Sequence, residues 1–136
     1  MLSKVISSAV LGIDAYPLEV EVDVASRGLP FFATVGLPAA AVKESKERAR
    51  AVLKNTGSEF PLKQVVVNLA PADIKKEGSA FDLPIAIGML IAEGILTQEQ
   101  AAGFLIVGEL SLDGRVKPVR GALSMAVLAK KAGYRG

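Results

Sequence analysis

The sequence contains no cysteine, no histidine and no tryptophan among its 136 residues. Without cysteine, a disulfide framework, a zinc site built from cysteine ligands and a cysteine nucleophile are all excluded. Without histidine, the usual general base, the usual imidazole metal ligand and every Ser-His-Asp triad are missing. Most of the common hydrolytic and metal-dependent enzyme classes are therefore excluded before any motif is considered.

Aromatic residues are also scarce, at 5% of a chain that is 51% hydrophobic, so the core must be aliphatic. The longest uncharged apolar run, residues 83–92, is half the roughly 20 residues that a bilayer crossing requires. We therefore expect no membrane span and a cytoplasmic protein. The apolar stretch after Lys4 could pass for a short signal peptide, but Asp14 directly after it favours a strand. The mean hydropathy of +0.40 is high for one small domain, which predicts that a partner covers some apolar surface.

Hydrophobic periodicity and turn residues predict an α+β domain over residues 1–136. Leu18, Val20, Val22 and Val24 alternate with acidic residues, which is typical of a half-buried strand, and Tyr16-Pro17 is the predicted turn before it. Asp82 is the predicted N-cap of an apolar helix over 83–95. The remaining predicted strands are 4–13, 31–35, 64–69, 104–110 and 116–119. The remaining helices are 38–55 and 121–132, with Gly57 and Gly133 as the predicted stops after them. Strand runs mixed with crossover helices predict one mixed sheet with helices packed on one face.

Nucleotide-binding motifs are absent from the sequence. Neither a G-x-x-x-x-G-K-[ST] loop nor a G-x-G-x-x-G turn between a strand and a helix is present. We therefore expect no nucleotide, metal or other cofactor to be bound by this chain.

The loop before the apolar helix brings Lys75, Lys76 and Ser79 close to a helix N-terminus, which favours anions such as the phosphates of nucleic acid. The alternative is that Gly78 and Ser79 form a turn and the lysines are solvated. Two other interpretations are weaker. Ser79 could be a nucleophile activated by a lysine, which would require a buried lysine. A metal could be held by the carboxylates Asp73, Glu77 and Asp82, although solvation and capping also account for them.

The charge distribution is uneven, although 16 basic and 14 acidic residues give a net charge of only +2. Residues 1–26 carry one lysine and four acidic side chains, a net charge of −3, whereas residues 111–136 carry six basic and one acidic, a net charge of +5. Such asymmetry indicates a basic face of the kind that binds nucleic acid. The alternative is a solvated hairpin plus lysines that complement a helix C-terminus. Because no aromatic residues are interleaved with the basic ones, readout of single strands by base stacking is not expected.

Three segments resemble the N-terminal domain of the magnesium chelatase-like AAA+ ATPases of the ComM/YifB group: residues 36–48 (GLPAAAVKESKER), 67–88 (VNLAPADIKKEGSAFDLPIAIG) and 107–121 (VGELSLDGRVKPVRG). The resemblance covers essentially the whole chain. It implies a ribosomal protein S5 domain 2-like fold, shared with the proteolytic domain of Lon and the C-terminal domain of RadA.

Comparison with Lon implies that this chain is not an enzyme. The alignment places Ala80 at the position of the Lon nucleophile, with Ser79 one residue earlier, and Leu123 at the position of the catalytic lysine. In Lon the loop and the hairpin together form the active site, so we expect residues 75–80 and the hairpin 108–121 to lie close together.

The family resemblance also implies a larger assembly. Members carry a downstream AAA+ module, absent here, that binds ATP and Mg, and they resemble hexameric DNA helicases that act in branch migration. The leading interpretation is a non-catalytic module that contacts its own AAA+ module, neighbouring subunits and DNA. Its predicted contact residues are Lys75, Lys76, Ser79, Arg115, Lys117 and Arg120. The alternatives are a pure protein–protein interaction domain and, third, a degenerate Ser-Lys peptidase.

Overall fold

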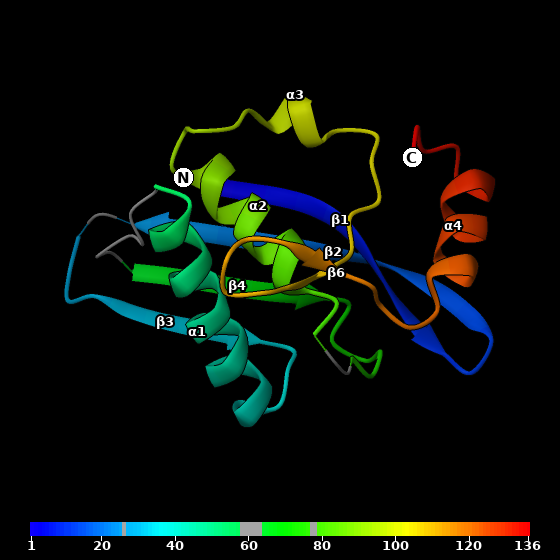
Figure 1. The fold of residues 1–136 in the computed structure, drawn as a ribbon, viewed down its shortest axis with the longest axis horizontal. Helices are drawn as coiled ribbons and strands as arrows, with labels where there is room; N and C mark the ends of the chain where they lie inside the picture. The colour runs from blue at the N-terminus through cyan, green and yellow to red at the C-terminus, as the bar shows by residue number, and fades with distance from the viewer. Residues whose placement is uncertain (26, 58–63, 77–78) are drawn as a thin grey trace.

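The computed structural model describes residues 1–25, 27–57, 64–76 and 79–136, which form a four-stranded mixed sheet with helices packed against it. The strand order is β1-β2-β4-β3, and Figure 1 shows α1 and α2 on one side of this sheet. β1 (Leu2–Leu11), β2 (Asp14–Ala25) and β4 (Gln64–Ala70) are successively antiparallel, whereas β3 (Phe31–Val35) is parallel to β4. The predicted α+β class with a mixed sheet is confirmed.

The helices are α1 (Ala39–Asn55), α2 (Asp82–Ala92), α3 (Gln98–Ala101) and α4 (Ala122–Lys131). A small hairpin of β5 (Glu109–Leu110) and β6 (Val116–Lys117) lies near α2. Gly57 and Gly133, predicted to stop α1 and the last helix, both have positive φ directly after the helix C-caps, as C′ glycines do. Among the described residues, no helix is long and apolar enough to cross a membrane.

The aliphatic core lies between the sheet and α2. The predicted alternation in β2 is confirmed, because Leu18, Val20, Val22 and Val24 are all buried. Gly88 lets α2 approach the sheet closely, since a Cβ at this residue would lie 2.6 Å from Cγ2 of Val22. The hydroxyl of Ser3 donates to the Gly88 carbonyl at 2.6 Å and fixes this contact.

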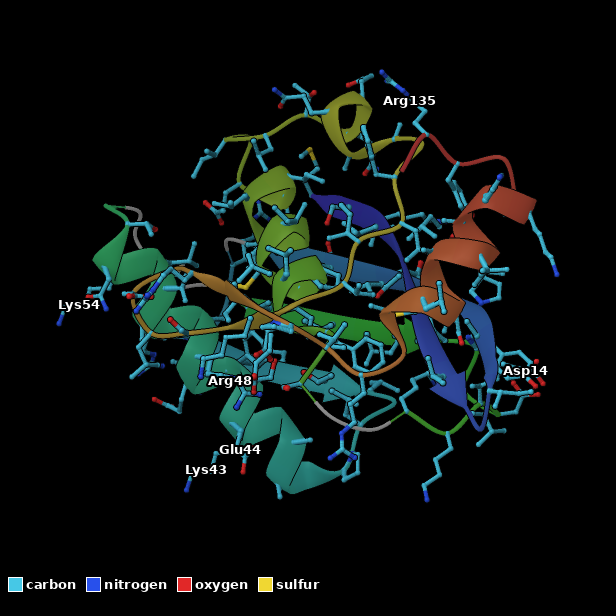
Figure 2. All side chains as sticks on the ribbon, turned by 45° about the vertical axis from the view of Figure 1, so that its right-hand side comes forward. Asp14, Lys43, Glu44, Arg48, Lys54 and Arg135 are labelled. Atoms are coloured by element: carbon cyan, nitrogen blue, oxygen red, sulfur yellow. The ribbon has the colours of Figure 1, made fainter. Side chains whose placement is uncertain are left out.

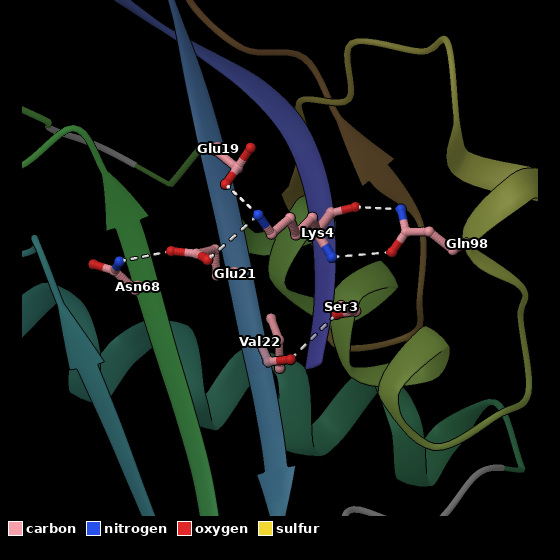
Figure 3. A network of polar contacts seen from close by, with 7 residues as sticks. All are labelled: Ser3, Lys4, Glu19, Glu21, Val22, Asn68 and Gln98. Carbon is pink, nitrogen blue, oxygen red and sulfur yellow. Dashed lines mark hydrogen bonds and ion pairs between the residues drawn. The ribbon is translucent and has the colours of Figure 1, made fainter. Parts of the chain in front are cut away.

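The opposite face of the sheet carries a polar network (Figure 3). The ammonium of Lys4 lies 3.3 Å from Glu19 and 4.0 Å from Glu21, and Asn68 donates to Glu21 at 2.9 Å. The Gln98 side chain both donates to the carbonyl of Lys4 (2.6 Å) and accepts from its amide (3.1 Å). Gln98 thus hydrogen-bonds to the edge strand β1 as a neighbouring strand would.

Several local predictions are wrong. The first turn lies at Gly12-Ile13, and Tyr16-Pro17 lies inside β2. β2 pairs with β4 only from Glu19 onward, so Pro17 sits where β2 has no partner on that side, a place that tolerates a missing N–H. The predicted strand 104–110 is a strand only at Glu109–Leu110, preceded by a single bridge from Leu105 to Ile6.

The short helix α3 was not predicted. Thr97 and Gln100 form a capping box at its start: the hydroxyl of Thr97 accepts from the amide of Gln100, and the Gln100 side chain accepts from the amide of Thr97. The Thr-x-x-Gln signature of this motif is present in the sequence and could have identified the helix.

Candidate nucleic-acid and partner interface

A pocket of about 760 Å³ lies where β1 ends, between the segment that precedes α2 and the segment that leads into α4. Backbone hydrogen bonds hold its walls together. The amide of Gly108 donates to the carbonyl of Ala80 (2.8 Å), and the amide of Leu83 donates to the carbonyl of Gly108 (3.0 Å). The predicted proximity of the loop and the hairpin segment is therefore confirmed.

Ser79 and Arg120, two of the predicted contact residues, both line this pocket, together with the hydroxyl-bearing Ser8 and Ser124. Glu109 is the only carboxylate, and no lysine is present, among the described residues that line it. The first turn of α4 opens beside it, with Gly121 as N-cap and without an acidic residue or a side-chain cap. The pocket therefore combines hydroxyls, one cation and a helix N-terminus.

Arg115 and Lys117 lie on the β5–β6 hairpin and are exposed. Asp113 organises the turn: it accepts from the hydroxyl of Ser111 and from the amide (3.1 Å) and Nε (2.9 Å) of Arg115. These contacts, the Ser111 hydroxyl first, lower the pKa of Asp113 to about 2. Arg115 is thus an exposed cation that already has a carboxylate partner.

Lys76 and Lys75 differ in their surroundings. Lys76 is only 3% exposed, and its ammonium donates to the carbonyls of Pro71 and Ile74 (2.9 Å for the latter), so it stabilises its own loop. Lys75 is exposed and lines two hollows, one next to residues 36–38 and one next to residues 9–12. Glu77 and Gly78 of the predicted loop lie outside the described residues. The predicted contact residues therefore fall into separate groups: Ser79 with Arg120, the hairpin cations, and Lys75.

Asp82 is not the predicted N-cap of α2. Phe81 occupies that position, and Asp82, 1% exposed, accepts from Nε (2.6 Å) and Nη2 (3.0 Å) of Arg48 and from the amide of Leu110 (3.1 Å). Burial raises the pKa of Asp82, and the hydrogen bonds from Arg48 and Leu110 oppose that rise. The hydrogen bond to Asp82 raises the pKa of Arg48. Asp82 therefore links α1, α2 and β5.

Of the three carboxylates considered for a metal, Asp82 faces Arg48 and Glu77 lies outside the described residues. No group of three or more histidine, cysteine, aspartate or glutamate side chains that could hold a metal ion occurs in the described part of the chain. Arg48 and Asp82 are 34 residues apart, so no local pattern in the sequence reveals their pairing. Arg48 also lies 3.6 Å from Glu44, its i,i+4 neighbour on α1.

Comparison with known proteins defines the class. The chain belongs to the family described as subunit ChlI of Mg-chelatase, whose sequence model matches residues 20–136. It corresponds to the N-terminal region of YifB- and ComM-like members, as the sequence motifs predict.

Three relatives illustrate this similarity. The uncharacterised protein YifB of Escherichia coli K12 is 47% identical over 134 residues, which cover 98% of this chain and 26% of that protein. The competence protein ComM of Haemophilus influenzae is 43% identical over 131 residues, covering 96% of this chain and 26% of that protein. The uncharacterised protein Rv2897c of Mycobacterium tuberculosis is 42% identical over 133 residues, covering 98% of this chain and 26% of that protein. The chain thus spans about a quarter of the length of these relatives.

Proposed function

We propose that this chain is the non-catalytic N-terminal module of a cytoplasmic AAA+ ATPase of the ComM/YifB group, with an S5 domain 2-like fold. The module supports assembly of a hexameric ring and contacts DNA, while ATP and Mg bind to a separate AAA+ module. The observation that carries this proposal is the match of nearly the whole chain to one quarter of a relative named a competence protein.

The pocket supports a non-catalytic role. The residue at the position of the Lon nucleophile is Ala80, and Leu123, at the position of the Lon lysine, is 79% exposed on α4. Because no described lysine lines the pocket, no amine is present there to activate Ser79. A serine-reactive fluorophosphonate probe should leave Ser79 unlabelled. Labelling that disappears in Ser79→Ala would refute the non-catalytic role and favour the Ser-Lys peptidase.

The exposed cations Arg115, Lys117 and Arg120 support DNA contact, with Lys75 as a fourth. Lys76 is omitted from this set, because its ammonium is buried against two carbonyls. Anisotropy titrations with labelled duplex DNA measure the salt slope, which is the slope of log K against log salt concentration. In the variant R115Q/K117Q/R120Q this slope should be smaller by roughly 0.9 for each phosphate contact removed. The control R27Q/K130Q/K131Q removes the same charge from exposed residues elsewhere and should bind as the unmodified chain does.

Ring support is tested in the full-length protein. Deleting residues 1–136 should reduce the hexamer fraction in sedimentation velocity and reduce the stimulation of ATP hydrolysis by DNA. A truncated protein with unchanged hexamers and unchanged stimulation would refute the proposal.

Exposed apolar side chains favour a second candidate, a protein–protein interaction domain without DNA contact. Ile13, Leu29 and Val35 are all exposed. This candidate predicts self-association, or binding to the rest of the protein, together with no DNA binding at low salt. A strictly monomeric chain that binds DNA would exclude it.

A further inference from the structure

One side of helix α1 presents a stripe of basic residues, which we call the α1 stripe. Its members are Lys43, Lys46, Arg50 and Lys54, and their spacing of three, four and four residues places them on one side of an α-helix. A different side of α1 faces the core, where Ser45, Ala49, Val52 and Leu53 are buried. We propose that the α1 stripe binds the phosphate backbone of double-stranded DNA.

Three of the four cations of the α1 stripe have no carboxylate partner among the residues that the structure describes. The ion pairs of Arg48 with Glu44 and Asp82 lie on another side of the helix. Lys43, Lys46 and Lys54 form no ion pair with any other residue that the structure describes. Glu47 is the one carboxylate that the helical spacing places within the stripe.

The spacing of the stripe lines up its lysines. Lys43 and Lys46 are three residues apart, and Lys54 follows eight residues after Lys46, so these three lysines project from neighbouring turns on the same side of the helix. A polyanion that runs along this side can contact all three ammonium groups.

The shape of the stripe fits a duplex. Lys43 and Lys54 are eleven residues apart, so a rise of about 1.5 Å per residue separates them by about 16 Å along the helix axis. This distance is the length of about five base pairs at 3.4 Å each. Figure 2 shows both side chains pointing away from the body of the protein. α1 has no aromatic residue on which an unpaired base could stack, which favours backbone contact with a duplex over binding of a single strand.

The stripe continues toward the hairpin. The side chain of Asn55, at the end of α1, donates to the carbonyl of Leu112 at 2.7 Å, and Gly114 lies against Thr56. The hairpin that carries Arg115 and Lys117 is thus attached to the C-terminal end of the helix that carries the stripe.

The inference rests on the proposed function only in that the chain binds DNA. Variants of different cations distinguish a failure of the inference from a failure of the proposed function. The test measures anisotropy of a labelled duplex between about 50 and 200 mM salt, with circular dichroism as the check on folding. K43Q/K54Q should reduce the slope of log K against log salt concentration by about 1.8. Over this salt range, the variant should then lose affinity by a factor about twelve times smaller than the unmodified chain does. E47Q should strengthen binding and leave the fold intact.

K130Q/K131Q is the matched control, because it also removes two exposed helical lysines, at the C-terminal end of α4. The inference is overturned if K43Q/K54Q and K130Q/K131Q have equal salt slopes, or if E47Q weakens binding. If the hairpin variant R115Q/K117Q/R120Q loses binding while K43Q/K54Q does not, the inference fails and the proposed function stands. If the unmodified chain binds no duplex at low salt, both fail. Tighter binding of an unpaired strand than of the duplex would overturn the assignment to double-stranded DNA.

Discussion

Removing the buried Arg48–Asp82 pair should clearly lower the free energy of unfolding. Asp82 accepts three hydrogen bonds, two from Arg48 at 2.6 and 3.0 Å and one from the amide of Leu110 at 3.1 Å. Asp82→Ala leaves a guanidinium and a backbone N–H without their acceptor. Breaking a buried pair costs about 3–5 kcal/mol. Because Arg48 remains 21% exposed and regains some hydration, we expect about 3 kcal/mol.

Urea unfolding followed by far-UV circular dichroism measures this cost. Asp82→Asn removes the negative charge beside Arg48 but keeps one acceptor oxygen, so it should cost less than Asp82→Ala, about 1–2 kcal/mol. The double variant Arg48→Met/Asp82→Leu removes both charges and should cost less than either single alanine variant, as other buried pairs do when replaced by apolar residues. A cost for Asp82→Ala within about 0.5 kcal/mol, the range of ordinary surface substitutions, would refute the reasoning.

The pH dependence gives an independent check. Burial already raises the pKa of Asp82, and Arg48→Ala removes the main contact that opposes this rise. A carboxyl whose pKa is higher in the folded than in the unfolded state binds a proton more tightly when folded, so lowering the pH toward its ordinary value stabilises the fold. The stability difference between Arg48→Ala and the unmodified chain should therefore narrow between neutral pH and about pH 4.5. A constant or widening difference would mean that Asp82 is not the group left unpaired.

Three further predictions concern single residues. Gly88→Ala should destabilise the protein by about 1–2 kcal/mol in thermal unfolding despite the higher helix propensity of alanine, because the added Cβ would lie 2.6 Å from Val22; unchanged or increased stability would contradict the close packing. Lys76→Met should cost about 1–3 kcal/mol, because the carbonyls of Pro71 and Ile74 lose their donor. It should leave the salt slope of DNA binding unchanged, and a reduced slope would show that the ammonium reaches phosphate. Asp113 has a folded-state pKa of about 2, below its ordinary 3.8, so the stability it supplies is present above pH 3.8 and lost as the pH falls toward 2. Asp113→Asn should remove that part of the acid dependence, as measured by hydrogen exchange of the hairpin amides.

Local patterns predicted the fold well wherever the decisive contact was local or periodic. The alternation in β2 identified its buried face, and glycines marked the ends of α1 and α4. The pattern failed at Pro17, because whether a proline breaks a strand depends on which side of that strand is paired. It failed again over 104–110, where an apolar run that looks like a strand has only a single bridge before Glu109.

The site was predictable in its chemistry and less so in its geometry. Ser79 and Arg120 could be placed at one pocket from the resemblance alone, and the structure brings them there. Lys76 looks solvated in the sequence because its neighbours are polar, yet its loop folds back so that two of the loop's own carbonyls surround its ammonium. Asp82 looks like a cap because it begins a helix, and its partner Arg48 is too far away in the chain to be found by spacing. Burial of a charged side chain is a tertiary property, so local sequence could not supply it.

The same buried pair connects the two basic elements for which we propose DNA contact. Asp82 binds Arg48 on α1 and the amide of Leu110 on β5, so it fixes the hairpin relative to the helix that carries the α1 stripe. Two groups of cations bind one rigid duplex most tightly when their spacing is set before binding, because less conformational entropy is then lost. Asp82→Asn retains every exposed cation and weakens this link. It should therefore lower the affinity for duplex DNA while leaving the salt slope unchanged. Unchanged affinity would instead mean that this pair does not hold the hairpin and the α1 stripe as one unit.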